Sequence, residues 1–268
     1  MPTEPKVAAI IPARWGSTRF PGKPLAEIRH KPMIQWVVEK ARQAKLVSEV
    51  FVATDDQKIF DAVSGFGGKA IMTSPDHPTG TDRIAEAASG ISCDFVVNVQ
   101  GDEPLVLPDN IDLTVEALLQ DDSIQVSTLM APIQGIEEIF NANVTKVVAD
   151  LAGFALYFSR SPIPYFRDRR GDISVQVEQD ARSFTNAPWF KHIGIYAYSR
   201  SFVRAFPNLS KTAPEEYEGL EQLRILGNSI PIKVIETREN AVSVNCPEDI
   251  QKVESLLGAS ESDPGKPA

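Results

Sequence analysis

A strand that runs into a cationic, glycine-containing loop near the N-terminus constrains this chain more than any other feature. The segment at 7–25 reads VAAIIPARWGSTRFPGKPL, and its apolar run stops at Pro12. The polar loop that follows carries cations, glycines and a serine: Arg14, Arg19, Lys23, Gly16, Gly22 and Ser17. Phosphate oxygens need donors and positive charge, and glycine lets the backbone approach them closely. The loop therefore predicts a polyphosphate site at the end of a buried strand.

The spacing in this loop excludes a Walker A motif, because Lys23 is followed by Pro24 rather than by Ser or Thr. The chain has a net charge of −9 at pH 7, which argues against a nucleic-acid groove or an anionic membrane surface. The positive charge of this loop contrasts with the net negative charge of the whole chain. By itself, it is also compatible with a solvated basic loop.

Cysteine usage and the N-terminal segment indicate a soluble cytoplasmic protein. Cys93 and Cys246 are the only cysteines, so no disulfide framework or CxxC metal site can be built from them. The opening MPTEPK lacks the basic and apolar regions of a signal peptide, and no apolar run approaches the roughly 20 residues that span a bilayer. We expect residues 259–268 to be a flexible tail.

Apolar runs and amphipathic segments alternate through the first half of the chain. The predicted strands are 7–11, 50–54, 69–73, 95–100 and 124–132, and the predicted helices are 32–45, 56–66, 80–89 and 109–120. Continuous apolar strands that alternate with helices predict an α/β fold, in which a mainly parallel sheet is covered by helices on both faces.

The regular alternation of apolar strands and amphipathic helices ends at about residue 144. TKVVAD and FALYFS predict a β-hairpin, and the proline-containing residues 161–189 predict a long loop. Further strands are predicted at 191–199, 232–237 and 241–245, with helices at 216–226 and 247–257. We expect a single domain over 1–258: a nucleotide-binding half at about 7–144, a smaller mixed substrate and dimerisation lobe at 145–230, and a return to the main sheet at 231–258.

Two further motifs contain residues suited to binding a metal ion or a substrate. QGDEP at 100–104 directly follows a predicted strand, and ligands of open α/β sheets bind beyond the carboxyl ends of strands. A carboxylate there suits Mg²⁺, which prefers oxygen ligands and bridges to substrate phosphates, so Asp102 predicts a magnesium site. A plain turn aspartate is the alternative.

The second motif is TGTDR at 79–83, where Thr81 is predicted to cap a helix. Arg83 then falls in the first turn, which the helix dipole makes unfavourable for a cation unless an anion faces it. A bound nucleotide and a structural salt bridge explain Arg83 equally well.

Seven motifs taken together resemble one enzyme family. They are PARWGSTRFPGKPL, ATDD, TGTDRIAEA, VNVQGDEP, ALYFSRSPIPYFRDR, KHIGIYAY and LEQLR, in this order. Over about residues 7–257 the chain resembles the 3-deoxy-manno-octulosonate (Kdo) cytidylyltransferases. The first motif also occurs in the wider sugar nucleotidyltransferases, and QGDEP, YFSR and HxGIY narrow the resemblance to the Kdo branch.

The resemblance implies the nucleotide-diphospho-sugar transferase type of α/β fold and a homodimer. It also implies CMP transfer from CTP to Kdo, with Mg²⁺, for lipopolysaccharide biosynthesis. The CTP site would comprise Pro12, Ala13, Arg14, Ser17, Arg19, Lys23, Thr81, Arg83 and Asp102. Of these, Arg14, Lys23 and Asp102 would serve catalysis, and Asp102 would bind Mg²⁺. The Kdo site would comprise Gln100, Arg160, His192, Tyr196 and Glu221.

Some of these residues have structural alternatives. Tyr196 lies in an alternating strand and is compatible with a core position, and a lone strand histidine such as His192 is often a hydrogen-bonded structural residue. His30 and His77 are interpreted as loop residues.

One position departs from the family pattern. The family V-D-x-P-E-D, whose Asp supplies a second metal carboxylate, reads VNCPED at 244–249, so Asn245 replaces that Asp. An amide oxygen can coordinate Mg²⁺ but adds no charge, so a second metal would be held more weakly. Glu248 and Asp249 are predicted to cap the last helix. Two other functions stay open: CMP transfer to the 8-amino analogue of Kdo, and a weakly active or regulatory CTP-binding homologue.

Overall fold

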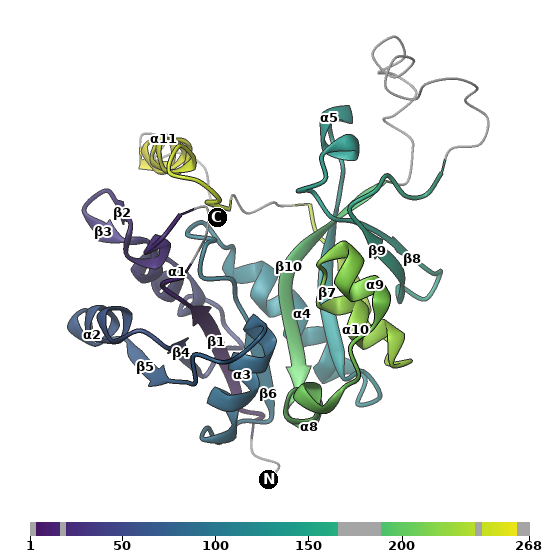
Figure 1. The fold of residues 1–268 in the computed structure, drawn as a ribbon, viewed down its shortest axis with the longest axis horizontal. Coiled ribbons are helices and arrows are strands. Elements are labelled where there is room, and N and C mark those ends of the chain that lie inside the picture. The colour runs from purple at the N-terminus through teal and green to yellow at the C-terminus, as the bar shows by residue number, and fades with distance from the viewer. Residues whose placement is uncertain (1–3, 17–19, 166–188, 239–242, 262–268) are drawn as a thin grey trace.

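A nine-stranded sheet forms the centre of the protein, as the computed structural model shows (Figure 1). The structure describes residues 4–16, 20–165, 189–238 and 243–261, with side chains up to 258. Ser17, Arg19, most of the long loop predicted at 161–189, and the predicted tail at 259–268, apart from the backbone of its first three residues, lie outside the described residues.

The strands begin and end close to the predicted positions. Those of the sheet are β1 (Val7–Ala13), β4 (Glu49–Thr54), β5 (Lys69–Met72), β6 (Phe95–Asn98), β7 (Val126–Pro132), β8 (Lys146–Ala149), β9 (Ala155–Ser159), β10 (Phe190–Ser199) and β11 (Lys233–Glu236). A separate small hairpin contains β2 (Glu27–Ile28) and β3 (Lys31–Pro32).

The main path of the sheet has the order β11-β7-β10-β6-β1-β4-β5. Its β6-β1-β4-β5 part is parallel, and β11 is parallel to β7. β10 runs antiparallel between β6 and β7 and also pairs with β8, which forms the predicted hairpin with β9. The predicted α/β fold is confirmed, and the chain after residue 144 inserts a central strand into the same sheet.

Helices cover both faces of this sheet (Figure 1). They are α1 (Met33–Ala41), α2 (Gln57–Gly65), α3 (Gly80–Ser89), α4 (Pro108–Gln120), α5 (Ile136–Phe140), α8 (Arg200–Ala205), α9 (Ala213–Glu218), α10 (Gln222–Gly227) and α11 (Asp249–Glu261), with short 3₁₀ turns η1 (Lys23–Leu25) and η2 (Phe206–Asn208).

Strand β1 shows why helices pack against both faces of the sheet. Successive strand side chains point to opposite faces, and all of Ala8, Ala9, Ile10 and Ile11 are buried. Ala9 and Ile11 pack in a cluster with residues of α1, α2 and α4, whereas Ala8 and Ile10 pack with residues of α3, α8 and α10. None of the described helices is long and apolar enough to cross a membrane.

Two sequence predictions of secondary structure were wrong. The helix predicted at 216–226 is two helices, α9 and α10, because Gly219 adopts a left-handed backbone with φ of 62° and ends α9. In the strand predicted at 241–245, the described residues 243–245 form no strand. Val244 instead bonds to a loop, since its N–H donates to the Asp102 carbonyl at 2.9 Å.

Candidate active site

Two adjoining cavities open beside the carboxyl ends of β1 and β6. The larger, about 340 Å³, is lined by Pro12, Ala13, Arg14, Lys23, Pro24, His77, Pro78, Thr79, Gly80, Arg83, Gln100, Gly101, Asp102 and Glu221. The smaller, about 220 Å³, is lined by Thr81, Asn98, Gln100, Thr145, His192, Gly194, Tyr196, Tyr198, Phe206, Gly219, Leu220, Glu221, Gln222 and Ile225. Gln100 and Glu221 belong to both linings, so the two cavities meet at these residues.

The floor of the larger cavity forms where two parallel strands end side by side. β1 ends at Ala13 and leads into the cationic loop, and β6 leads into QGDEP. A Cβ on Gly101 would lie 2.9 Å from the Pro12 carbonyl oxygen, which is closer than real Cβ contacts. Glycine at this position therefore lets the QGDEP turn lie directly against the end of β1.

Lys23 and Asp102 form the central ion pair of the larger cavity. The Lys23 ammonium lies 2.5 Å from an Asp102 carboxylate oxygen and also donates to the Val244 carbonyl at 3.1 Å. The cationic loop, the QGDEP turn and the segment before α11 thus meet at one ammonium group. Asn245 follows Val244 directly, so its backbone lies beside the Asp102 turn, and metal binding by its side chain stays a prediction.

Glu103, which follows Asp102 in the chain, is buried. Burial, and then the charge of Asp102, raises the pKa of Glu103 to about 8. Its carboxyl group is therefore mostly protonated at neutral pH, which limits the negative charge at this turn.

The larger cavity also contains the start of α3. Thr79 caps this helix, since its hydroxyl accepts from the Asp82 N–H at 3.2 Å. The prediction that Thr81 is the cap was wrong, although Thr81 does line the smaller cavity. The Glu221 carboxylate accepts from the N–H groups of Gly80 and Thr81, at 3.3 and 3.4 Å. An acidic group at a helix N-terminus is favourable, so Glu221 joins α10 to α3.

Arg83 has a structural anion partner. Its guanidinium donates to the Asp55 carboxylate and the Thr73 hydroxyl, each at 2.6 Å, and the residue is 4% exposed. The structural salt bridge is thus present, and it explains why a cation is tolerated in the first turn of α3. Arg83 also lines the larger cavity, so contact with a nucleotide stays a prediction.

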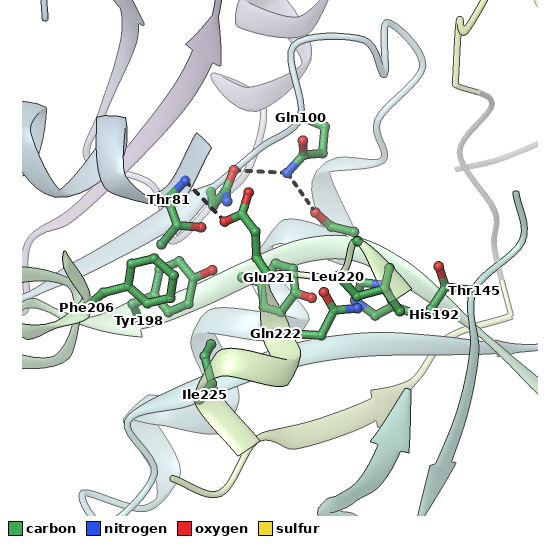
Figure 2. Close-up of a pocket in the computed structure, with 14 residues that line it drawn as sticks. Thr81, Gln100, Thr145, His192, Tyr198, Phe206, Leu220, Glu221, Gln222 and Ile225 are labelled. Carbon is green, nitrogen blue, oxygen red and sulfur yellow. Dashed lines mark hydrogen bonds between the residues drawn. The ribbon is translucent and has the colours of Figure 1, made fainter. Parts of the chain in front are cut away.

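The smaller cavity is built on β10 and the end of β6 (Figure 2). The Gln100 amide donates to Asn98 Oδ1 at 3.1 Å and to the Gly194 carbonyl at 3.2 Å. These bonds use both of its N–H groups and leave its oxygen as an acceptor. Burial lowers the pKa of His192 to about 3 and raises that of Tyr196, so both rings are neutral at physiological pH. Tyr196 is 8% exposed: it is both a core residue and part of the cavity wall.

Four of the five predicted sugar-site residues line the smaller cavity: Gln100, His192, Tyr196 and Glu221. Arg160 does not. Its guanidinium donates to the carbonyl groups of Glu218, at 2.6 Å, and Ala142, at 2.9 Å. In this arrangement Arg160 anchors the end of α9 to the segment before β8, and sugar contact by Arg160 stays a prediction.

Asp249, at the start of α11, anchors the segment that precedes this helix. The Asp249 carboxylate accepts from the N–H groups of Asn245 and Cys246, at 2.7 and 3.0 Å, which precede the helix. Asp249 is the first residue of α11, where a negative charge is favourable. Asp249 thus lies at the start of α11 as predicted, but its carboxylate binds the preceding turn, and Glu248 directly precedes the helix, in the flanking position of a cap.

Several residues that line the two cavities had no role predicted from the sequence. His77 and His30 are loop residues as predicted, but His77 also lines the larger cavity and pairs with Glu86 of α3. Asn98, Thr145 and Gln222 line the smaller cavity. A signal existed for Asn98, because it is a polar residue within the apolar strand that also leads to Gln100. A signal existed for Gln222 as well, because it follows Glu221 in the LEQLR motif, whereas Thr145 had none.

A family model described as cytidylyltransferase matches residues 8–235. The chain is 49% identical to the 3-deoxy-manno-octulosonate cytidylyltransferase of Geobacter sulfurreducens, over 92% of this chain and 97% of that one. It is 50% identical to the protein of that name from Geotalea daltonii, over 92% and 96% of the two chains. The chain belongs to this cytidylyltransferase family. It is therefore a nucleotidyltransferase by descent, as the motifs indicated.

A solved structure shares the whole fold. It is described as CMP:2-keto-3-deoxy-manno-octonic acid synthetase in complex with CTP, and it is 41% identical with a TM-score of 0.85. The match covers 95% of this chain and 99% of that one. This family member therefore shares the fold of that synthetase over nearly its whole length.

Proposed function

We propose that this protein transfers CMP from CTP to Kdo, and releases CMP-Kdo and pyrophosphate. The observation that carries the proposal is the junction of two chemically different cavities at Gln100 and Glu221. The larger is lined by Arg14, Lys23 and Arg83, whereas no Lys or Arg is among the described residues that line the smaller. A polyanionic nucleotide and a hydroxylated sugar fit these two environments.

The proposed reaction takes place at this junction. CTP lies in the larger cavity with its triphosphate toward Arg14 and Lys23, and Kdo lies in the smaller cavity. The C2 hydroxyl of the sugar attacks the α-phosphorus, its oxygen forms the new P–O bond, and the bond to the pyrophosphate oxygen breaks. Such a displacement depends on alignment and charge neutralisation. Gln100, whose free oxygen is an acceptor, is suited to orient a sugar hydroxyl at the junction.

Mg²⁺ is the proposed cofactor. Among the described residues no cluster of three or more His, Cys, Asp or Glu side chains could hold a metal by itself. Mg²⁺ in nucleotide sites is commonly held by one or two carboxylates together with substrate phosphates, and Asp102 at the cavity edge fits that arrangement. When bound, the ion supplies charge neutralisation on the phosphates. Asp102 would hold it, with Asn245 as a neutral second ligand.

The direct test is a pyrophosphate-release assay with CTP or UTP as donor and Kdo as acceptor, at increasing Mg²⁺. We expect release that requires CTP, Kdo and Mg²⁺ together. CTP binding in a calorimeter without release would instead support the regulatory homologue. Release with the 8-amino sugar in preference to Kdo would support the other alternative.

We also propose a homodimer that works in the cytoplasm, in the supply of activated Kdo for lipopolysaccharide. β9 pairs only with β8 among the described strands, and Leu156 and Tyr157 on it are exposed. Exposed apolar groups on a sheet edge suit contact with a second copy. Light scattering of the purified protein tests this, with twice the monomer mass of 29.4 kDa expected.

A further inference from the structure

The turn between β2 and β3 has a strained backbone. Ile28 pairs with Lys31, so Arg29 and His30 form a two-residue hairpin turn, and both have a positive φ, of 47° and 64°. Turns with two positive φ angles favour Asn and Gly, because other side chains meet steric resistance in the left-handed region. Residues such as Arg and His keep this conformation only where their surroundings hold it, so contacts made by the turn must offset its strain.

Arg29 makes these contacts, and its partner is α11. Its backbone N–H donates to the Glu254 carboxylate at 3.0 Å, and its guanidinium donates to the Glu254 carbonyl at 3.3 Å. A Cβ on Gly258 would lie 2.7 Å from the same guanidinium nitrogen, so this group packs directly against the helix backbone. A cation beside the last turn of a helix is favourable. Arg29 therefore joins α11 to the hairpin beside it (Figure 1).

The apolar contact between the hairpin and α11 is small. The hairpin is anchored to α1, because the Trp36 indole N–H donates to the Ile28 carbonyl at 2.9 Å. In the part of the chain that the structure describes, the fully buried members of the cluster under α11 are Ile28, Met33, Val244 and Val253. Hydrophobic stabilisation is proportional to the apolar area buried, so so small a cluster leaves much of the docking of α11 to the polar contacts of Arg29.

The segment that precedes α11 continues from the helix to the larger cavity. Asp249, at the start of α11, accepts from the two N–H groups that follow Val244. Val244 itself donates to the Asp102 carbonyl at 2.9 Å, and its carbonyl accepts from the Lys23 ammonium at 3.1 Å. A continuous set of contacts thus runs from Arg29, through α11, to the Lys23–Asp102 ion pair.

We propose that Arg29 is a positioning residue for the reaction: it holds α11 on the hairpin and so keeps Val244 against Lys23 and Asp102. This inference rests on the proposed function. The Val244 carbonyl and the Asp102 carboxylate together set the direction of the Lys23 ammonium in the larger cavity. When α11 is released, the ammonium loses one of these two partners, and a small misplacement of a group that aligns the substrate lowers turnover.

Arg29→Gly tests this proposal, with His30→Gly as the matched control. Each variant places glycine at a positive φ in the same turn and relieves its strain, but only the first removes the guanidinium. Hydrogen exchange, followed by nuclear magnetic resonance, measures the docking of the segment before α11. The Val244 amide should exchange at least about tenfold faster in Arg29→Gly, while the amides of β1 keep their wild-type rates. His30→Gly should exchange like the wild type.

The pyrophosphate-release assay measures the effect on turnover. Arg29→Gly should lower kcat at least about fivefold and change the KM for Kdo by less than about twofold, because no described residue of the hairpin or α11 lines the smaller cavity. Arg29→Lys keeps a cation and a donor, so it should recover most of the lost kcat. Glu254→Ala breaks the same contact from the helix and should change exchange and kcat in the same direction as Arg29→Gly.

Three outcomes would overturn this inference and leave the proposed function standing. They are an unchanged kcat or unchanged Val244 exchange in Arg29→Gly, equal effects in His30→Gly, and faster exchange throughout β1, which would indicate a general loss of stability. No release by the wild type would overturn the proposed function and with it the role of Arg29 in turnover, whereas Val244 exchange would still test the contact between Arg29 and α11.

Discussion

The Lys23 ammonium lies 2.5 Å from the Asp102 carboxylate, although 79 residues separate them in the chain. Two consequences follow from this pairing. Asp102 has a counter-charge before any substrate binds, and Lys23 is directed into the larger cavity rather than into solvent. Both side chains are mostly shielded, with 16% and 30% of their surface exposed.

Asp102→Asn should reduce pyrophosphate release by at least about 100-fold, because the amide keeps the shape but removes the charge that a metal and Lys23 require. The far-ultraviolet circular dichroism spectrum should not change. Asp109→Asn is a matched control, since the Asp109 side chain is 84% exposed on α4. Turnover like that of the wild type in Asp102→Asn would remove this carboxylate from the mechanism.

Asn245→Asp should lower the Mg²⁺ concentration needed for half-maximal turnover, by roughly three- to tenfold, because a second negative ligand strengthens the attraction for the ion. The measurement is a Mg²⁺ titration at saturating CTP and Kdo. The melting temperature serves as a control, because the Asn245 backbone, which binds Asp249, is retained. An identical Mg²⁺ profile in the two proteins would contradict the proposed role of position 245.

Arg83→Met should lower the free energy of unfolding by about 3 kcal/mol, because it leaves the shielded Asp55 carboxylate without its partner. Adding Asp55→Asn should recover part of that loss, and urea unfolding of both single variants and the double variant measures the coupling. The KM for CTP distinguishes the structural role of Arg83, its ion pair with Asp55, from direct contact with the nucleotide. If the KM returns to the wild-type value along with stability in the double variant, Arg83 acts only through the structure of α3.

Acid should weaken the fold through His192. The unfolded chain takes up a proton at this residue near pH 6.5, whereas the folded protein does so only near pH 3. The unfolded state therefore binds more protons between these values, and stability falls as pH drops below 6.5, by about 1 kcal/mol at pH 5.5. Urea unfolding at pH 7.5 and 5.5 should show this loss in the wild type. His192→Gln should show a smaller loss, and equal losses would contradict the assignment.

Much of the fold could be predicted because its strands are short apolar runs with clear ends. β1, β4 and β6 are buried on both faces, so their sequences are continuously apolar and end where polar loops begin. The break between α9 and α10 could not be predicted from that pattern. It depends on the left-handed conformation of Gly219, and the apolar periodicity continues across it.

The cationic loop at 12–25 and the QGDEP turn could be recognised from residue types and their order, because phosphate and metal chemistry requires those groups near strand ends. The interest of Asn245 came only from the resemblance to the family pattern. Only the tertiary structure decided that Arg83 pairs with Asp55, that Arg160 binds backbone carbonyls, and that Gln222, Thr145 and His192 line one cavity. These relationships join segments distant in sequence, and packing alone sets which polar groups find partners and which stay available to a ligand.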